Sequence, residues 1–253
     1  MKIAIIQYSP EWENIENNII TVNEMIDNSV GNADLIILPE MSLTGFTMHA
    51  ANFAQDIDSD EMLYLINKSK KIKKHIFAGI IEKDDGEYYN SLIHFENNGL
   101  INARYRKIHL FSMAKENKFY VAEKTPIITK IDDFHIGLSI CYDLRYPELY
   151  RFYGKEKAEV IVNIANWPIP RIEHWKVLLR ARAIENQCYM IGVNRVGKDP
   201  YNEYNGCSAV YDPMGSELLL ADDKEEVFTV DINISRVKQI REELPFLDDI
   251  KLI

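Results

Sequence analysis

Short apolar segments alternate with amphipathic ones along this chain, and the same alternation begins twice. Residues 2–8 and 35–38 have the composition of buried strands, and the segment between them repeats apolar residues at helical spacing. The order starts again with an apolar strand at residues 135–141, followed by a helix that begins at Pro147. Strands that alternate with helices form sheets with helices on their outer faces. The pattern therefore favours an α/β fold.

Three strands in the middle of the chain are joined by tight turns. They cover residues 75–81, 88–96 and 100–105, and the connections read Asp84-Asp85-Gly86 and Asn97-Asn98-Gly99. Turns of the Asp-Gly and Asn-Gly type connect antiparallel neighbours. The sheets are therefore expected to be mixed rather than purely parallel.

Further segments complete the predicted set of elements. A helix is capped by Ser59, a loop covers about residues 110–124, and no stretch resembles a linker or a repeat. The remaining segments with a strand or helix pattern are residues 160–164, 171–187, 190–195, 208–211 and 226–230, with a late helix from Ser235. We therefore expect a single domain over residues 1–253, made of mixed sheets whose outer faces are covered by helices.

The overall charge and the length of the apolar runs limit the classes of partner. Lys plus Arg number 29 and Asp plus Glu 39, so the net charge of −10 is opposite to that of a general nucleic-acid binder. With 47% apolar residues the chain can bury a large core, which excludes a disordered protein. The longest apolar runs fall far short of the ~20 residues that span a bilayer, and no export signal is visible. We therefore expect a soluble cytoplasmic protein that binds neither nucleic acid nor membrane.

The cysteines do not form a recognisable framework. They lie at positions 141, 188 and 207, an odd set without a CxxC pair or a cluster of histidines nearby. This argues against both a disulfide scaffold and a structural zinc site. A cysteine with a function would therefore act singly.

Three chemically unusual residues follow predicted strands, namely Glu40, Lys107 and Cys141. Each alone has an ordinary explanation, as a solvated turn carboxylate, a surface ammonium or a small buried hydrophobic group. Together they could serve a thiol nucleophile, with the carboxylate as its base and the ammonium stabilising a developing oxyanion. A Cys-His protease is disfavoured, because the one histidine after Cys141 is His174, which lies in a predicted helix.

The segments around these residues resemble the nitrilase or carbon-nitrogen hydrolase superfamily over nearly the whole chain. LIILPEMSLTGF (35–46), YRKIHLF (105–111) and LSICYDLRYPEL (138–149) are similar to the family segments that carry its catalytic Glu, Lys and Cys. The separations of 67 and 34 residues between Glu40, Lys107 and Cys141 also suit the family. The resemblance implies a four-layer αββα sandwich and a reaction that needs no metal and no organic cofactor.

The resemblance also implies a second glutamate between the lysine and the cysteine. Glu116 is the first choice and Glu123 the competitor. Many relatives have Pro-Gly or Ala-Gly shortly after this glutamate, whereas this sequence has Ala122-Glu123 and so departs from the family pattern in this loop. By the same resemblance, the backbone N–H of Tyr142 would help to bind the oxyanion. Either glutamate could instead be solvated.

Within the superfamily, the residues after the cysteine point to an amidase. Tyr142-Asp143 resembles the amidase branches, whereas nitrilases usually have Trp-Glu there. The segments ANWPIPR (165–171), HWKVLLRARAIENQ (174–187) and GVNRVG (192–197) resemble the bacterial ω-amidase group most closely. Enzymes of that group hydrolyse 2-oxoglutaramate to 2-oxoglutarate and ammonia, and the resemblance implies the same reaction for this chain. Hydrolysis of an N-carbamoyl amine or another aliphatic amide is the alternative, and a nitrilase or a non-enzymatic binding protein is less favoured.

Two further residues are candidates for substrate binding. An oxo-acid substrate carries a carboxylate, for which Arg145 is the first candidate, with a structural ion pair to a neighbour such as Glu148 as the alternative. Trp167 would form a wall of the pocket or else be a core aromatic.

The family also implies a homodimer. The helix from Arg171 has apolar residues at 175, 178, 179 and 184, more apolar surface than one sheet face would cover. The alternative is that this stripe packs on its own sheet.

Overall fold

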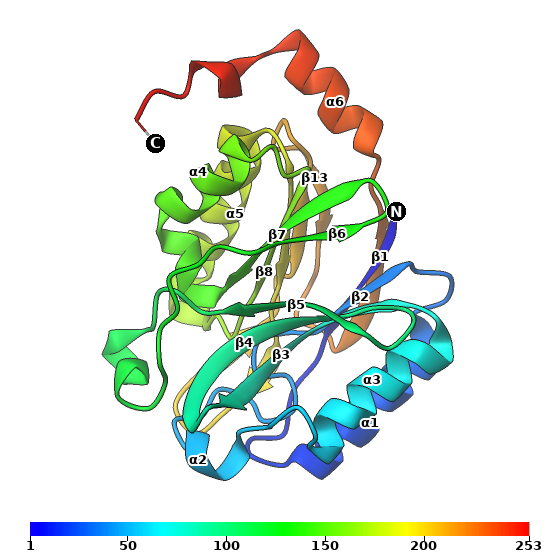
Figure 1. The fold of residues 1–253 in the computed structure, drawn as a ribbon, viewed down its shortest axis with the longest axis vertical. Coiled ribbons are helices and arrows are strands. Elements are labelled where there is room, and N and C mark those ends of the chain that lie inside the picture. Colours follow the sequence, from blue (N-terminus) through cyan, green and yellow to red (C-terminus); the bar gives the residue numbers. More distant parts are fainter. Residues whose placement is uncertain (253) are drawn as a thin grey trace.

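Two six-stranded mixed sheets pack against each other in the computed structural model, which describes residues 1–252 (Figure 1). The first sheet has the order β14-β1-β2-β3-β4-β5, made of β1 Lys2–Gln7, β2 Leu35–Ile37, β3 His75–Asp84, β4 Glu87–Phe95, β5 Ile101–Arg106 and β14 Glu226–Asp231. The second has the order β13-β12-β9-β8-β7-β6, made of β6 Ile128–Ile131, β7 Phe134–Ile140, β8 Val160–Ile164, β9 Tyr189–Val193, β12 Ala209–Tyr211 and β13 Glu217–Leu220. Buried side chains from both sheets form one core between them.

Helices cover the outer face of each sheet. Helices α1 Ile15–Ser29 and α3 Asp60–Ile72 bury apolar residues against the first sheet. Helices α4 Pro147–Lys155 and α5 Ile172–Asn186 do the same on the second sheet. The layer order is therefore helix, sheet, sheet, helix, and the predicted four-layer αββα sandwich is confirmed.

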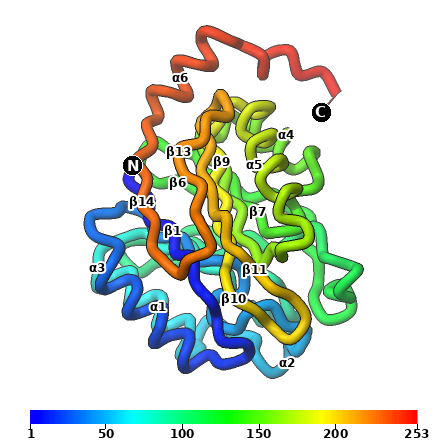
Figure 2. The backbone as a smooth tube through the Cα atoms, turned by 180° about the vertical axis from the view of Figure 1, so that it is seen from behind, coloured from blue at the N-terminus to red at the C-terminus, as the bar shows by residue number. Residues whose placement is uncertain are grey.

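Three smaller elements lie outside the four layers. The short helix α2 Ala50–Phe53 follows the connection after β2, and β10 Val196–Lys198 pairs with β11 Glu203–Asn205 as a separate hairpin. Helix α6 Ile234–Glu243 and the residues after it lie beyond the sheets at one end of the sandwich (Figure 2). Among residues 1–252, no helix combines the length and apolarity that a membrane span requires.

The parallel strands of both sheets bring several connections to one edge. Strands β1, β2 and β3 are parallel, and so are β7, β8 and β9. The chain leaves β2 toward Glu40, β7 toward Cys141 and β8 toward Asn166. Because ligands of α/β sheets bind beyond the carboxyl ends of parallel strands, this edge is where chemistry is expected.

The structure agrees with most predicted elements and adds four short strands. The Ser59 hydroxyl accepts a hydrogen bond from the N–H of Met62 at 3.3 Å, and Pro147 is the first residue of α4, as predicted. The sequence missed β6, β10, β11 and β13, which have at most four residues each and contain exposed or half-exposed side chains. Neither a continuous apolar run nor a long alternation marks β6, β10 and β11, whereas β13 contains three consecutive leucines that were not assigned to a strand.

The apolar stripe predicted on α5 divides between core and surface. Trp175 and Leu179 are fully buried against the second sheet, and Leu178 packs partly against the same core. Ile184 is 48% exposed and Val177, on the same helix, is 64% exposed. The sheet therefore covers only part of the apolar surface of this helix.

A pair of neutral histidines lies between the two sheets. His75 Nδ1 of β3 is 2.9 Å from His94 Nε2 of β4, and His94 Nδ1 is 2.7 Å from the hydroxyl of Thr129 on β6. Burial, aided by the neighbouring His75, lowers the pKa of His94 to about 3. Burial lowers the pKa of His75 as well. Both rings therefore stay neutral at pH values at which a solvent-exposed histidine would be protonated.

We expect the folded state to lose stability as the pH falls below about 6.5, partly through His94. The unfolded histidine has a pKa near 6.5, so between roughly pH 6.5 and pH 3 the unfolded state binds the extra proton, at a cost of about 1.4 kcal/mol per pH unit. Urea unfolding at pH 7.5, 6.5 and 5.5 measures this slope. His94→Gln should flatten it and the control His135→Gln, at an exposed site, should not. An unchanged slope in His94→Gln would contradict the assignment.

Candidate active site

Glu40, Lys107 and Cys141 meet beside one pocket although they come from three different strands. Glu40 follows β2, Lys107 follows β5 and Cys141 follows β7. The Lys107 ammonium donates a hydrogen bond to Glu40 Oε1 at 2.9 Å, and Lys107 and Cys141 both line the pocket. The three strand-end residues singled out in the sequence are therefore brought together.

A glycine lets the Glu40 segment approach the neighbouring strand. A Cβ atom at Gly79 of β3 would lie 2.6 Å from Glu40 Cα and 2.6 Å from the carbonyl oxygen of Pro39. The Gly79 carbonyl also accepts a 2.7 Å hydrogen bond from the N–H of Ser42. The backbone on both sides of Glu40 is therefore fixed against β3.

Cys141 occupies a strained turn that is held by a buried carboxylate. Its φ of 47° is in the left-handed region, which side chains other than glycine rarely adopt, and it begins the 3₁₀ turn Cys141–Arg145. The Asp143 carboxylate accepts hydrogen bonds from the N–H of Ile140 at 2.9 Å and from the hydroxyl of Tyr105 at 2.7 Å. In the sequence, Asp143 served only as a mark of the amidase branches, and no role in holding the cysteine turn was predicted for it.

The first N–H groups of this turn are available to a ligand. The opening N–H groups of a helical turn have no acceptor within the turn, and the N–H of Tyr142 is among them. Tyr142 also lines the pocket beside Cys141.

The carboxylate of Glu116, rather than that of Glu123, contacts the Lys107 ammonium. Both carboxylate oxygens of Glu116 lie 3.1 Å from Lys107 Nζ, and the side chain is fully buried. The N–H of Phe111 donates to Glu116 Oε2 at 2.6 Å. The Glu123 carboxylate accepts a hydrogen bond from the N–H of Lys124 at an exposed position. The structure therefore places Glu116 in the network and leaves Glu123 outside it.

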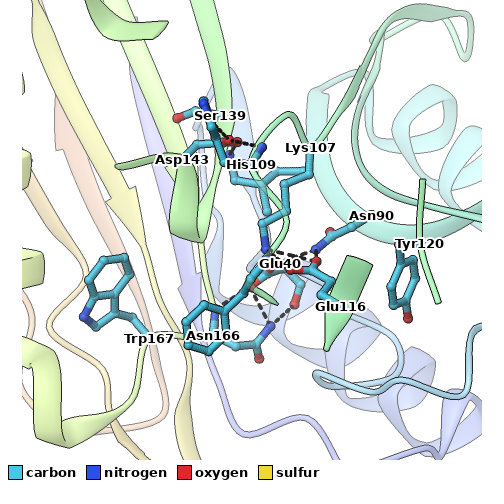
Figure 3. A network of polar contacts seen from close by, with 12 residues as sticks. Glu40, Asn90, Lys107, His109, Glu116, Tyr120, Ser139, Asp143, Asn166 and Trp167 are labelled. Atoms are coloured by element: carbon cyan, nitrogen blue, oxygen red, sulfur yellow. Dashed lines mark hydrogen bonds and ion pairs between the residues drawn. The ribbon is translucent and has the colours of Figure 1, made fainter. Parts of the chain in front are cut away.

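Two asparagines complete the network, and the sequence analysis did not name either of them (Figure 3). The Asn90 amide donates to Glu40 Oε1 and to Glu116 Oε1, each at 2.8 Å. The backbone N–H of Asn166 donates to Glu40 Oε2 at 2.8 Å and also faces the Cys141 sulfur. Both oxygens of Glu40 are therefore saturated with donors from groups that line or support the pocket.

The charges of the network set the protonation of the acids. Burial alone would raise the pKa of Glu40, but the Lys107 charge and the hydrogen bonds from Lys107, Asn90 and Asn166 outweigh it and hold that pKa below its usual range. Burial and the negative charge of Glu40 together raise the pKa of Glu116, against the opposing effect of Lys107. Glu40 is therefore the carboxylate that is held ionised most firmly.

The same charges keep the cysteine in its thiol form. Burial raises the pKa of Cys141 well above its usual range, the charge of Glu40 raises it further, and Lys107 opposes both. The pKa of Lys107 lies well above its usual value, because the charges of Glu116 and Glu40 outweigh the lowering effect of burial. The resting site therefore contains a neutral thiol, an ionised carboxylate and an ammonium, a set that can activate the thiol when a substrate accepts the charge.

Arg145 lies in the pocket without a carboxylate partner. Its guanidinium carbon is 4.8 Å from the centre of the Trp167 ring, and Nη1 is 3.3 Å from His174 Nδ1. Within residues 1–252 no carboxylate lies within 4.0 Å of its nitrogens, so the alternative of an ion pair with Glu148 is wrong. His174 does not line the pocket, so the alternative Cys-His arrangement is not formed.

Trp167 is both a core aromatic and a wall of the pocket. It is 2% exposed, its indole N–H donates to the carbonyl of Arg171 at 2.7 Å, and its ring packs 5.4 Å from that of Trp175. It also lines the pocket, as does Arg171, which the sequence indicated only as the start of a helix. The pocket encloses about 520 Å³ including its mouth. In the part of the chain that the structure describes, no group of three His, Cys, Asp or Glu side chains is arranged to hold a metal ion.

Comparisons with known proteins agree with this geometry. Residues 2–242 match the carbon-nitrogen hydrolase family. The 2-oxoglutaramate amidase of Bacillus subtilis is 33% identical over 253 residues, which cover 98% of this chain and 97% of that protein. Omega-amidase YafV of Escherichia coli K12 is 33% identical over 254 residues, covering 98% and 96%.

A solved structure extends the agreement to three dimensions. The crystal structure of XC1258 from Xanthomonas campestris, described as a CN-hydrolase superfamily protein with an arsenic adduct in its active site, superposes with a TM-score of 0.95. The sequence identity is 29%, and the match covers 100% of this chain and 98% of the other. The chain therefore belongs to the carbon-nitrogen hydrolase family and is an amide-hydrolysing enzyme.

Proposed function

We propose that this enzyme hydrolyses the terminal amide of a small 2-oxo acid, with 2-oxoglutaramate as the preferred substrate and 2-oxoglutarate and ammonia as products. The observation that carries the proposal is the unpaired Arg145 guanidinium, which shares a pocket with Cys141 in a chain of net charge −10. A guanidinium without a protein carboxylate is a ready partner for the carboxylate of the substrate. The similarity to 2-oxoglutaramate amidase and to an omega-amidase supports the same substrate class.

In the proposed reaction, Glu40 takes the proton of Cys141 while the sulfur attacks the amide carbon. Glu40 is available for this role because it is ionised at rest, while the thiol still carries its proton. The negative charge that develops on the amide oxygen would be stabilised by the Lys107 ammonium and the N–H of Tyr142.

Glu40 then gives the proton to the departing nitrogen, and ammonia leaves a thioester on Cys141. Water activated by Glu40 hydrolyses the thioester and restores the thiol. Glu116 would act through Lys107, since both of its oxygens contact the ammonium and fix its position. The proposed scheme uses only side chains and backbone groups of this chain.

Replacing Arg145 by alanine tests the substrate class. We expect KM for 2-oxoglutaramate to rise about 10- to 100-fold, because a hydrogen bond to a charged group contributes about 1.5–3 kcal/mol. Steady-state ammonia release measures the change. The KM of a neutral amide such as butyramide should stay constant, and Arg180→Ala, at an exposed site on α5, should change neither.

Two results would contradict the proposed substrate. One is an Arg145→Ala enzyme that binds 2-oxoglutaramate as well as the parent does. The other is faster turnover of an N-carbamoyl amine than of 2-oxoglutaramate in the same ammonia-release assay.

We also infer that the enzyme is a homodimer and works in the cytoplasm. Val177 and Ile184 of α5 are 64% and 48% exposed, an apolar area that a second copy of the chain would bury. All three cysteines are free, which suits a compartment that keeps thiols reduced. Sedimentation at twice the chain mass of 29.4 kDa would support the dimer, and sedimentation at 29.4 kDa would contradict it.

A further inference from the structure

A second, larger pocket adjoins the catalytic one. The two pockets share the walls formed by Phe46, Ala114 and Asn202. The second pocket, which we name the outer chamber, encloses about 1010 Å³ including its mouth. Besides the shared walls, it is lined chiefly by Trp12, Met48, Met113, Phe119 and Tyr201.

The outer chamber is lined mostly by aromatic and apolar side chains, and several of these are largely exposed. The Trp12 and Tyr201 rings meet edge to face at 6.3 Å. Met113 is 81% exposed, Tyr201 is 77% exposed and Phe119 is 45% exposed. The lining contains no carboxylate. Its polar members besides Asn202 are Thr47, the exposed Lys115 and His49, whose Nδ1 lies 2.7 Å from the Glu13 carboxylate. Apolar side chains gathered in a concave surface beside a catalytic site are typical of a ligand subsite.

The catalytic pocket has a cationic side and an apolar side. Arg145 and Arg171 contribute the cations, and their neighbours in the lining are Tyr142, Trp167 and Pro168. The walls shared with the outer chamber contain the apolar side chains of Phe46 and Ala114 beside the polar Asn202, and the ring centre of Phe46 lies 5.8 Å from Lys107 Nζ. A bound acid amide would therefore have its carboxylate at one end of the pocket and its reactive amide at Cys141.

The position of Glu40 indicates which way the leaving nitrogen points. In the proposed function, Glu40 protonates that nitrogen, so the nitrogen must face the Glu40 side of Cys141. Phe46 of the shared wall follows Glu40 by six residues along the chain, and Met48 of the outer chamber follows it by eight. A substituent on the nitrogen would thus extend past Phe46, away from the arginines.

We propose that the outer chamber is a leaving-group subsite that binds an apolar, aromatic amine. The enzyme would then also hydrolyse amides of 2-oxoglutarate whose nitrogen carries an arylalkyl group. This inference rests on the proposed function. The sulfur of Cys141 bonds to the carbonyl carbon, the C–N bond breaks, and the amine departs with the proton from Glu40. Water then cleaves the thioester, so one amide and one water give one acid and one amine.

The test compares 2-oxoglutaramate with its N-benzyl analogue. Both give 2-oxoglutarate, so one assay of that product reports kcat/KM for each. We expect the N-benzyl amide to be hydrolysed within about 10-fold of the primary amide. Met113→Ser and Tyr201→Ser should lower the ratio of N-benzyl to primary kcat/KM by about 3- to 10-fold, the size of one lost aromatic contact. The matched control Phe246→Ser removes an aromatic ring that is 61% exposed outside both pockets, and should leave the ratio unchanged.

The outcomes separate this inference from the proposed function. Hydrolysis of 2-oxoglutaramate with N-benzyl turnover more than 1000-fold slower would overturn the subsite alone. N-benzyl turnover with a ratio that neither chamber variant changes would also overturn it, because the substituent would then bind elsewhere. No hydrolysis of 2-oxoglutaramate would overturn the proposed function and this inference with it.

Discussion

Glu40→Gln should lower kcat for 2-oxoglutaramate by about 10³- to 10⁴-fold without unfolding the protein. General acid–base catalysis contributes about 10²–10⁴-fold, and Glu40 is proposed to act in three proton transfers, which favours the upper end. The amide still offers an oxygen to Lys107, and Lys107 keeps both contacts with Glu116. The buried ammonium therefore retains a countercharge, and the loss should fall on turnover rather than on folding.

The control for Glu40→Gln is the same substitution at Glu123, a glutamate that does not contact the Lys107 ammonium. Glu123→Gln removes a carboxylate outside the network, and we expect its kcat to stay within about 2-fold of the parent. Thiol labelling of Glu40→Gln, with circular dichroism to verify folding, would show that Cys141 is still accessible. A Glu40→Gln enzyme that keeps a tenth of the parental kcat would contradict the role of Glu40 as base.

The convergence of Glu40, Lys107 and Cys141 beside one pocket could be predicted, because each follows a predicted strand and lies in a segment that resembles the family. Glu40 and Cys141 directly follow short apolar strands of an alternating pattern, and Lys107 follows a strand that turn signals delimit. Parallel strands carry such residues to one edge of a sheet whatever the details of packing. The location of these residues at the ends of predicted strands therefore indicated that their side chains would lie at the same edge of the sheets.

The supporting residues could not be predicted, because their roles depend on contacts across the sheets. Asn90 lies inside β4, and only the packing of β4 between β3 and β5 aims its amide at Glu40 and Glu116. Asp143 stabilises the turn at Cys141 partly through Tyr105, which belongs to the other sheet. A local pattern contains no information about such neighbours.

Glu116 and Glu123 illustrate the same limit within a single loop. Both are acidic residues between the predicted strands, and the chain offers no periodicity there that would separate a buried position from an exposed one. The structure separates them through two 3₁₀ turns, Ser112–Ala114 and Glu116–Lys118, which place the Glu116 carboxylate beneath the N–H of Phe111. Short 3₁₀ turns have few sequence signals, so the choice between the two glutamates depended on the family resemblance alone.

Lys107→Met should abolish turnover and lower the free energy of unfolding by about 3–5 kcal/mol at pH 7. Lys107 is fully buried between Glu40 and Glu116, and removing one partner of a buried ion pair leaves uncompensated charge in the core. Methionine fills a similar volume, so the loss reflects charge rather than a cavity. Urea unfolding measures the stability, and Lys124→Met, at an exposed site, is the matched control and should change it by less than about 0.5 kcal/mol.

The pH dependence and a second substitution distinguish charge from packing. Without the ammonium, the folded-state pKa values of both carboxylates rise above their unfolded values, so the stability they contribute is present at low pH and lost as the pH increases. The deficit of Lys107→Met relative to the parent should therefore shrink between pH 7 and pH 5, a comparison in which the His94 contribution cancels. Lys107→Met/Glu116→Gln should recover part of the stability at pH 7 but none of the turnover, because Cys141 would still lack its cation. A deficit that is constant with pH and unaffected by Glu116→Gln would mean that Lys107 stabilises the fold through packing and that the two carboxylates do not share its charge.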